Sequence, residues 1–468
     1  LESSLSYRLN VDYSGVINVS LSDLTTVSSA TTYLGAEGEE KAQKTYNYNY
    51  DGTAVKSITD FDYTADRLSQ STTYRSSGAS YLVATIGVRR SVTNYTGNEG
   101  EEKAQITYNF NFLANKIKSA TVFNYDADRL ESSLSYRLNI DYSGVINVGA
   151  SALTTVSSAT TYLGAEGEEK AQKTYNYNYD GTAVKSITDF DYTADRLSQS
   201  TTYRSSGASY LVATIGVRRS VTNYTGNEGE EKAQITYNFN FLANKIKSAT
   251  VFNYDADRLE SSLSYRLNVD YTGVINVSLS DLTTVSSATT YLGAEGEEKA
   301  QKTYNYNYDG TAVKSITDFD YTADRLTQST TYRSSGASYL VATIGVRRSV
   351  TNYTGNEGEE KAQITYNFNF LANKIKSATV FNYDADRLES SLSYRLNVDY
   401  TGVINVSLSD LTTVSSATTY LGAEGEEKAQ KTYNYNYDGT AVKSITDFDY
   451  TADRLSQSTT YRSSGASY

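Results

Sequence analysis

The sequence contains no histidine, cysteine, methionine, tryptophan or proline in 468 residues. Without cysteine it can form neither a disulfide nor a thiolate metal site, and its compartment cannot be inferred from cysteine usage. Without histidine or cysteine, catalysis by a Ser-His or Cys-His arrangement is excluded. The lack of oxidation-prone sulfur and indole suits a long-lived extracellular material. Duplication of one short unit that happened to lack these residues explains the absences equally well.

Charge and hydropathy bear on two further classes of partner. The chain carries 42 Lys+Arg and 54 Asp+Glu, so its net charge is −12, and the charges are dispersed. Nucleic acids and anionic membranes attract concentrated basic faces, so we expect neither as a partner. No run of residues approaches the roughly 18 apolar residues that span a bilayer, and no signal peptide is visible. Because the chain begins with Leu1 and not methionine, we expect an interior piece of a longer protein.

A repeat of 129 residues organises the whole chain. The decapeptide LESSLSYRLN begins at Leu1, Leu130, Leu259 and Leu388. The predicted units are therefore 1–129, 130–258, 259–387 and a partial unit, 388–468. Each full unit is a doublet of 62- and 67-residue halves, because EGEEKAQ recurs at Glu37, Glu99 and Glu166. No linker separates the units, which favours one continuous stacked structure over separate domains.

A finer period of 13 residues lies within each half-unit, for example from Val55 to Leu68 and from Phe61 to Tyr74. Each 13-mer has a turn of three or four residues and a run of about nine in which Tyr, Phe, Val, Ile and Thr alternate with polar residues. This pattern is typical of an antiparallel meander. We predict an all-β fold of antiparallel β-meander repeats, with about 13 residues per strand plus turn, forming a continuous repetitive sheet or stacked fibre. About five strands per half-unit, or ten per 129 residues, are expected.

The segment TYNYNYDG (Thr45–Gly52) shows what these strands could bury. A strand over 42–50 places Tyr46, Tyr48 and Tyr50 on one face and the intervening asparagines on the other. Alternation in the next strand assigns one face to Val55, Ser57, Thr59, Phe61 and Tyr63 and the other to Lys56, Ile58, Asp60 and Asp62. The sheet is thus expected to have an aromatic face and a mostly polar face. Tyrosine hydroxyls need partners, so the aromatic face suits a thin or partly wet core.

Three segments resemble YD repeats, which belong to the rearrangement-hotspot (Rhs) and teneurin-type family and run roughly Tyr-x-Tyr-Asp-x-x-Gly-Arg-Leu. The segments are YNYDGTAVKSI (48–58), FDYTADRLSQS (61–71) and FNYDADRLESS (123–133). The matching residues are Tyr125, Asp126, Arg129 and Leu130, and in part Tyr63, Arg67 and Leu68. The sequence departs from the family in its shorter turn, its shorter period, and Asp66 or Asp128 in place of the glycine before arginine.

The resemblance implies spiralling strips of antiparallel sheet on a giant bacterial or archaeal surface protein. The family's closed shell and toxin cargo do not carry over directly, since neither a plug domain nor an autoprotease segment is visible in this sequence.

Acidic residues recur in the predicted turns, as in FDYTAD, NYDAD and EGEE. A glycosidase-like carboxylate pair needs one acid with a raised pKa in a cleft. A pair copied into every unit is more typical of solvated surface, so we predict no enzymatic activity. Calcium is the alternative ligand, because hard cations prefer carboxylate and carbonyl oxygens. Its candidate ligands are Asp62, Asp66, Asp126 and Asp128. The competing interpretation is that these acidic turns keep the surface soluble and discourage edge pairing. No other cofactor is predicted.

Three functional hypotheses follow. The first is a structural segment of a tandemly repeated extracellular protein that forms a fibre, stalk or sheath by self-association of identical repeats. The second is an adhesin-type module that presents Tyr, Asn and Asp to glycans or cell surfaces. The third is an Rhs-like shell that encloses a cargo. The sequons at Asn18 and Asn94 allow glycosylation, although chance matches are expected in a chain this rich in Asn, Ser and Thr. We expect an extracellular or cell-surface location.

Overall fold

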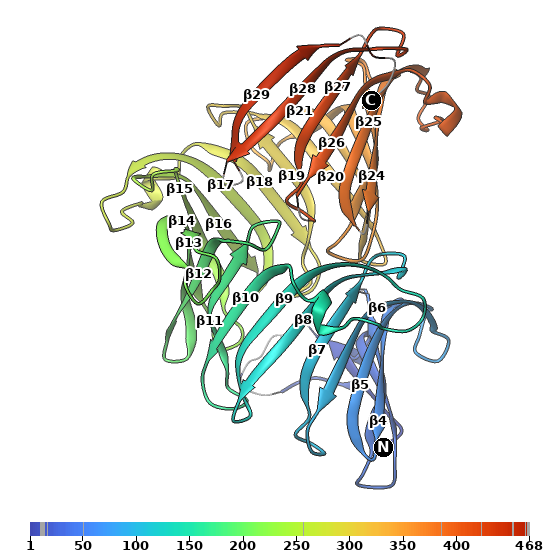
Figure 1. Cartoon of the computed structure of the whole chain (residues 1–468), viewed down its shortest axis with the longest axis vertical. Helices are drawn as coiled ribbons and strands as arrows, with labels where there is room; N and C mark the ends of the chain where they lie inside the picture. The colour runs from blue at the N-terminus through green and yellow to red at the C-terminus, as the bar shows by residue number, and fades with distance from the viewer. Residues whose placement is uncertain are drawn as a thin grey trace. The chain divides into compact units, whose positions relative to one another are not determined.

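The structure is a computed structural model that describes residues 1–9, 15, 17–49, 51–255, 257–384, 386–422, 424–451, 454–463 and 465. In this part of the chain, 29 strands form an antiparallel β-sheet, and the only helices are four 3-10 helices of three residues each (Figure 1). The predicted all-β fold class is confirmed. No helix of the described residues is both long and apolar enough to cross a membrane. The chain divides into two compact units: Leu1–Ala171 with Gly293–Glu297, and Gln172–Leu292 with Glu298–Tyr468.

The first unit contains ten whole strands and two 3-10 helices. They are β1 (Ser3–Arg8), η1 (Leu21–Asp23), β2 (Thr26–Leu34), β3 (Lys41–Tyr48), β4 (Val55–Thr64), β5 (Arg67–Ser77), β6 (Thr85–Thr96), β7 (Lys103–Phe110), β8 (Lys116–Asp126), β9 (Arg129–Asp141), η2 (Ala150–Ala152) and β10 (Val156–Leu163). Each strand from β1 to β10 pairs antiparallel with the next in the chain.

The same order of elements continues in the second unit, where consecutive strands again pair antiparallel. These elements are β11 (Lys170–Tyr177), β12 (Val184–Thr193), β13 (Arg196–Ser206), β14 (Thr214–Thr225), β15 (Lys232–Phe239), β16 (Lys245–Asp255), β17 (Arg258–Asp270), η3 (Leu279–Asp281), β18 (Val285–Leu292), β19 (Lys299–Tyr306), β20 (Val313–Thr322), β21 (Arg325–Ser335), β22 (Thr343–Thr354), β23 (Lys361–Phe368), β24 (Lys374–Asp384), β25 (Arg387–Asp399), η4 (Leu408–Asp410), β26 (Val414–Leu421), β27 (Lys428–Tyr435), β28 (Val442–Thr451) and β29 (Arg454–Arg462).

The strand count differs from the prediction. Strands β3 and β11 begin at equivalent residues, Lys41 and Lys170, and the 129-residue period between them contains eight strands, β3 to β10. The expected ten strands were wrong, because 129/8 gives about 16 residues per strand and connection. Two features lengthen the period. Several strands exceed nine residues, and the long connections after β5 and β9 contain no strand.

A β-bulge beside the turn between β3 and β4 changes the predicted faces. Asn47 pairs with Ser57, but Tyr48 pairs with Val55, so Lys56 is an extra residue on β4. A bulge of this kind breaks the alternation of side chains. Val55 therefore shares a buried cluster with Ile58, although strict alternation assigned these two residues to opposite faces.

The hydrophobic core lies on one face of the sheet, under two loops. Beneath the β5–β6 loop, Tyr81 and Ala84 cover a buried cluster formed by Ala30, Tyr48, Val55 and Ile58. Beneath the β9–β10 loop, a second cluster is formed by Val92, Tyr108, Phe110, Ile117 and Ala120. Each large apolar side chain buried in this way contributes about 1.5–3 kcal/mol. The core is thus assembled separately in each half-unit.

The tyrosines of TYNYNYDG have separate roles. The Tyr46 ring packs against Tyr81 with a centroid distance of 5.8 Å. Tyr48 is buried, and its hydroxyl accepts a 2.8 Å hydrogen bond from the Tyr81 amide. Tyr50 lies outside the described residues, but its equivalents Tyr308 and Tyr437 lie in a turn and are 88% exposed. The strand predicted to reach residue 50 therefore ends at Tyr48.

The other face of the sheet carries a ladder of hydroxyl groups. Thr59 lies on this face and hydrogen-bonds Thr73 across the strands at 3.0 Å, and cross-strand pairs of this kind stabilise a sheet by about 0.2–1 kcal/mol each. Equivalent pairs include Thr31–Thr45, Thr93–Thr107, Thr121–Ser135, Thr188–Thr202 and Thr317–Thr331. Two residues further along β4 on the same face is Phe61, whereas Tyr46 pairs with Ile58 on the opposite face. Aromatic rings thus occupy both faces, and the prediction of one aromatic and one polar face was wrong.

Candidate functional site: the two margins of the sheet

The connections between antiparallel strands form two margins of the sheet, because successive connections alternate between the two strand ends. One margin carries the connections β2–β3, β4–β5, β6–β7 and β8–β9 and their equivalents. All the EGEE and acidic hairpin turns lie there, and we call it the acidic margin. The other margin carries the connections β3–β4, β5–β6, β7–β8 and β9–β10 and their equivalents, and we call it the loop margin.

On the acidic margin, each EGEE turn from 99–102 onward is bonded to the preceding hairpin. The Glu102 carboxylate accepts a 2.8 Å hydrogen bond from the Leu68 amide. The same bond recurs at 2.7–2.9 Å between Leu130 and Glu169, Leu197 and Glu231, Leu259 and Glu298, Leu326 and Glu360, and Leu388 and Glu427. The amide of Leu68 is the main reason that the pKa of Glu102 lies below its ordinary value. This carboxylate is held in its charged form by a neighbouring strand.

Lysine and tyrosine side chains complete the ladder along this margin. The Lys41 ammonium lies 2.7 Å from Glu99 and 3.2 Å from Asp66, and its pKa is raised mainly by the hydrogen bond to Glu99. The Tyr63 hydroxyl donates a 3.0 Å hydrogen bond to the Ala42 carbonyl. At the equivalent tyrosine of the third repeat, burial raises the pKa of Tyr321 to about 12. Lys41 thus joins the carboxylates of two adjacent turns, and the Tyr63 phenol joins its hairpin to the main chain of β3.

The hairpin turns of the acidic margin have an unusual backbone. Ala65 and Asp66 have φ of 48° and 63°, and Ala127 and Asp128 have φ of 45° and 72°. Positive φ at both central residues is the geometry of a type I′ turn, which matches the twist of the flanking strands and usually favours Asn-Gly. Asp66 therefore occupies a left-handed position that glycine adopts at no steric cost.

The four predicted calcium ligands lie on this margin, but three of them have cationic neighbours. Asp66 and Asp128 each lie 3.2 Å from a lysine ammonium, and Asp126 lies 3.8 Å from the Arg129 guanidinium. Asp62 pairs with Gln70 across the strands. Among the described residues there is no group of three or more acidic, histidine or cysteine side chains that could hold a metal ion. Calcium binding stays a prediction.

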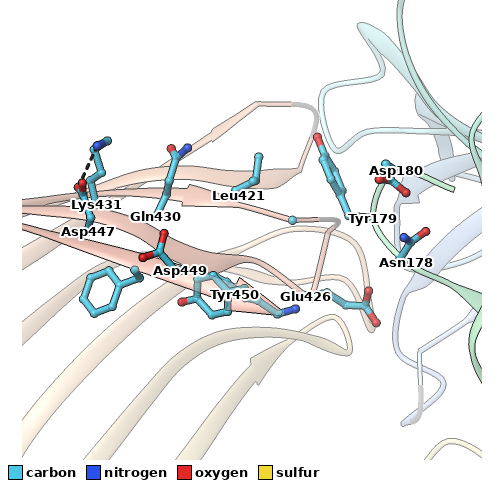
Figure 2. A pocket seen from close by; sticks show the side chains of 13 residues that line it. Asn178, Tyr179, Asp180, Leu421, Glu426, Gln430, Lys431, Asp447, Asp449 and Tyr450 are labelled. Atoms are coloured by element: carbon cyan, nitrogen blue, oxygen red, sulfur yellow. Dashed lines mark hydrogen bonds and ion pairs between the residues drawn. The ribbon is translucent and has the colours of Figure 1, made fainter. Parts of the chain in front are cut away.

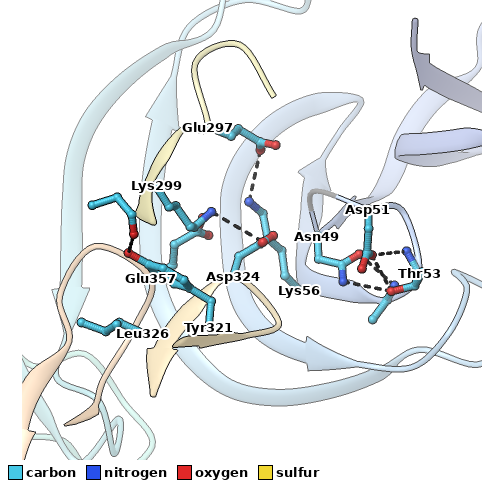
Figure 3. Close-up of polar contacts among 12 residues, drawn as sticks. Asn49, Asp51, Thr53, Lys56, Glu297, Lys299, Tyr321, Asp324, Leu326 and Glu357 are labelled. Atoms are coloured by element: carbon cyan, nitrogen blue, oxygen red, sulfur yellow. Dashed lines mark hydrogen bonds and ion pairs between the residues drawn. The ribbon is translucent and has the colours of Figure 1, made fainter. Parts of the chain in front are cut away.

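The loop margin has a rigid turn between β3 and β4. Asn49 accepts a 2.9 Å hydrogen bond from the Ala54 amide, and Asp51 accepts one of 2.9 Å from the Thr53 amide (Figure 3). Gly52 has φ of 71°, and a Cβ there would lie 3.0 Å from the Val27 nitrogen. These features explain why the sequence has Asp-Gly at this turn.

In the first unit, a glutamate of the acidic margin contacts this turn. Glu297, in the connection between β18 and β19, lies 2.6 Å from Arg8 and 3.1 Å from Lys56 (Figure 3). Arg8 also donates a 3.1 Å hydrogen bond to the Asn49 carbonyl, which fixes its guanidinium to the turn. Lys56 is the bulged residue of β4, so the bulge directs its ammonium out of the regular alternation.

The same contact recurs in the second unit between Lys185 and Glu426. Lys185 is again the bulged residue, since Asn176 pairs with Ser186 and Tyr177 pairs with Val184. Both ion pairs join residues 241 positions apart. We call the contact between the two margins the seam: Glu297 with Arg8 and Lys56, and Glu426 with Lys185.

A hollow of about 440 Å³ accompanies the seam in the second unit. Its lining includes Tyr179 and Asp180 from the loop margin and Leu421, Glu426 and Tyr450 from the acidic margin (Figure 2). Tyr179 is 36% exposed there, compared with 88% for the equivalent Tyr308 and Tyr437. The seam could not be predicted from the sequence. Its residues belong to repeated motifs, but nothing in the repeats indicates a 241-residue spacing.

Comparisons with known proteins give only distant matches. No family model matches the chain, and no curated protein does. Among solved structures, the chain is similar to the crystal structure of TcdB2-TccC3, with 11% identity and a TM-score of 0.26 over 91% of this chain and 23% of that one. It is also similar to the Photorhabdus luminescens Tc holotoxin pore with a mutated TccC3, with 11% identity and a TM-score of 0.23 over 90% of this chain and 22% of that one. The chain spans less than a quarter of the length of either matched chain. TM-scores this low support no conclusion about fold or function. The resemblance to YD repeats stays a prediction.

Proposed function

We propose that the chain is a structural segment whose tandem repeats build a self-supporting β-strip in an extracellular fibre, stalk or sheath. The observation that carries this proposal is the hydrogen bond from Leu68 to Glu102, which recurs at 2.7–2.9 Å in every successive half-unit from Leu68 to Leu388. Each half-unit supplies the acceptor that its predecessor needs. Added repeats then extend the structure without adding a new kind of contact.

The seam supports the same function. A carboxylate from a distant repeat binds two cations of the loop margin, Arg8 and Lys56. The residues that could otherwise attract a substrate or ion thus join parts of the chain to one another. In this proposal the protein has no catalytic activity, its site residues act mechanically, and its location is extracellular or on the cell surface.

The test of this function is the dependence of stability on repeat number. We expect a chain lengthened by one 129-residue unit to have a higher urea midpoint and a larger m-value than the 468-residue chain, because neighbouring repeats stabilise one another. An unchanged midpoint together with separate transitions would contradict the proposal. Electron microscopy of the native material provides a second test, in which discrete short particles without filaments would count against a fibre. Specific binding on a glycan array would favour the adhesin alternative.

A further inference from the structure

The β5–β6 loop and the start of β6 form an uncharged segment of the loop margin. The sequence of residues 78–88 is GASYLVATIGV, which contains no charged residue. Tyr81 and Ala84 pack against a buried cluster, whereas Leu82 and Val83, which lie between them, are 78% and 63% exposed. Two further aliphatic side chains of this segment are exposed at the start of β6. We call the four exposed side chains the apolar ridge: Leu82, Val83, Ile86 and Val88.

The apolar ridge recurs with the same exposure in three repeats. Ile86, Ile215 and Ile344 are 49%, 50% and 49% exposed. Unlike the exposure of the turn tyrosines, this value does not change with the position of the repeat in the chain, so it is a property of the local fold. Soluble proteins rarely expose large apolar patches, and those that they do expose commonly mark interaction sites. The equivalent ridges are Leu211, Val212, Ile215 and Val217, and Leu340, Val341, Ile344 and Val346.

The ridge is preformed, because hydrogen bonds fix the loop that carries it. The Val83 amide donates a 3.1 Å hydrogen bond to the Ser80 carbonyl, and the Tyr81 amide donates one of 2.8 Å to the Tyr48 hydroxyl. The same two bonds recur in the loops of the next two repeats. A surface that is already ordered loses little conformational entropy when it binds a partner.

The start of β6 also has a free strand edge. β6 pairs with β5 from Thr85 onward, but its pairing with β7 begins only at Ser91. Among the described residues, no second strand pairs with Thr85–Val88. Proteins protect such edges with charged side chains, proline or a bulge. This segment has no charge and no proline, and its bulge, opposite Arg75, begins after Ile86.

We propose that the apolar ridge binds the same ridge of a second copy of this chain, with the two β6 edges paired antiparallel about Ile86. A charged partner would lose hydration at this surface without gaining a counter-charge, whereas a second copy brings an equally uncharged surface. Antiparallel pairing about Ile86 places this residue opposite its counterpart and Ala84 opposite Val88. Apolar side chains then face one another across the strands, as in a stable sheet.

The contact is isologous, because both copies contribute the same surface. Each of the three ridges can take one partner, so one chain can join more than one neighbour. The inference deepens the proposed structural function and rests on it: the partner that a fibre or sheath requires is a neighbouring chain of the same kind. Since apolar side chains and main-chain groups form the contact, we expect it to persist at high salt, unlike a contact between charges.

A ridge variant of the full chain tests the proposal. It carries Ile86→Lys, Ile215→Lys and Ile344→Lys, because lysine on an edge strand opposes pairing with another chain. Self-association is measured by sedimentation velocity over a range of protein and salt concentrations. We expect the wild-type chain to associate and the ridge variant to associate at least about tenfold more weakly, which corresponds to about 1.4 kcal/mol. The urea midpoint of the variant shows that it is folded.

A matched control makes the same charge change away from the ridge. It carries Leu21→Lys, Leu279→Lys and Leu408→Lys, in the 3-10 helices η1, η3 and η4. These leucines are 84–88% exposed, and the second repeat has Ala150 at this position, so the fold accepts a change there. We expect the control to associate like the wild type. A control that loses association as the ridge variant does would show that exposed leucines in general, and not the ridge, hold the chains together.

Introduced cysteines test the pairing about Ile86, because the chain has no cysteine of its own. Residues directly opposite in an antiparallel pair have Cα atoms about 4.5–5.5 Å apart, which a disulfide can span. The variant Ile86→Cys, Ile215→Cys, Ile344→Cys is therefore expected to form disulfide-linked chains with oxidised glutathione, as seen on a non-reducing gel. Cysteines at the three control leucines are expected to give none.

Four outcomes would overturn the inference: a wild-type chain that stays monomeric, a ridge variant that associates like the wild type, association that is lost at high salt, or no cross-link between ridge cysteines. A monomeric wild type would leave the free edge to an extended segment of another protein. The stability gained from an added repeat can be measured in the ridge variant, in which the chains are separate. If that gain is present and association is absent, only the inference fails, whereas association without the gain overturns the proposed function.

Discussion

Tyr179 and Tyr308 occupy the same position in the same sequence, Tyr-Asn-Tyr-Asn-Tyr-Asp-Gly, yet their surroundings differ. Tyr179 lines the hollow beside Leu421 and Glu426 and is 36% exposed, whereas Tyr308 is 88% exposed. By contrast, Ile187 and Ile316, each eight residues further along, are both 1% exposed. The core of a half-unit is therefore a local property of the repeat, whereas the cover over its loop margin depends on residues some 241 positions later.

The largest effect is expected in the local core, where the two copies should behave alike. Ile187→Ala and Ile316→Ala each remove a fully buried side chain, which costs about 2–5 kcal/mol of unfolding free energy. We expect the two costs to agree, because both isoleucines pack within their own half-unit. Urea denaturation followed by far-UV circular dichroism measures this. Costs that differ by more than about 1 kcal/mol would show that the seam also supports the core.

A smaller effect is expected at the seam, and here the copies should differ. Glu297→Gln removes the charge that binds Arg8 and Lys56, and we expect a loss of about 1–2 kcal/mol. Glu39→Gln changes the equivalent, exposed residue and should cost close to nothing. The urea midpoints of the two variants provide the measurement. Equal midpoints would mean that the seam contributes nothing to stability.

The tyrosine pair should show a weaker form of the same difference. Tyr179→Ala removes a ring that is partly covered, so we expect a cost of about 0.5–1 kcal/mol. Tyr308→Ala removes a ring that is almost fully exposed, and its cost should lie within about 0.5 kcal/mol of zero. Thermal melts of both variants at the same pH make the comparison. A larger loss of stability in Tyr308→Ala than in Tyr179→Ala would contradict the conclusion that the turn of Tyr308 is uncovered.

The smallest effect per residue is expected on the acidic margin when the pH is lowered. There the Leu68–Glu102 and Leu130–Glu169 hydrogen bonds join neighbouring half-units and do not depend on distant repeats. The Leu68 and Leu130 amides lower the pKa of Glu102 and Glu169, so these carboxylates bind fewer protons in the folded than in the unfolded chain. Their stabilisation is present above the ordinary glutamate pKa of about 4.3 and is lost as the pH falls through the lowered value. The melting temperature should therefore fall below about pH 4. In the double variant Glu102→Gln, Glu169→Gln, the melting temperature should fall less steeply with decreasing pH. If the slope is unchanged, these two carboxylates do not cause the loss of stability.

Much of the fold could be predicted from single residues and their spacing. Alternation in 45–48 and 57–63 indicated strands, Asp51-Gly52 indicated a turn, and the acidic turns were placed between strands, as observed. The errors arose where pairing between strands overrides alternation. The bulge at Lys56 moved Val55 to the face of Ile58, and the third tyrosine fell in the turn and not in the strand.

The candidate site was less predictable. Sequence reasoning selected Asp62, Asp66, Asp126 and Asp128 because carboxylates near turns can bind calcium. Glu102 was counted only among the acidic residues of the EGEE turns, because its partner is the main-chain amide of Leu68, which carries no residue-specific signal. Sequence reasoning also passed over Lys56, because a lysine in a strand is ordinary until the bulge and the distant Glu297 are known.

The sequence alone determined the all-β class, the 129-residue repeat, and a composition that excludes disulfides and histidine- or cysteine-dependent catalysis. These are properties of neighbouring residues, since side-chain alternation and turn chemistry act within a few positions. Only the tertiary structure decided which copy of an identical segment is covered. The twist and the bulges of many successive strands together determine which distant residues meet. They place Glu297 beside Lys56 and Glu426 beside Lys185.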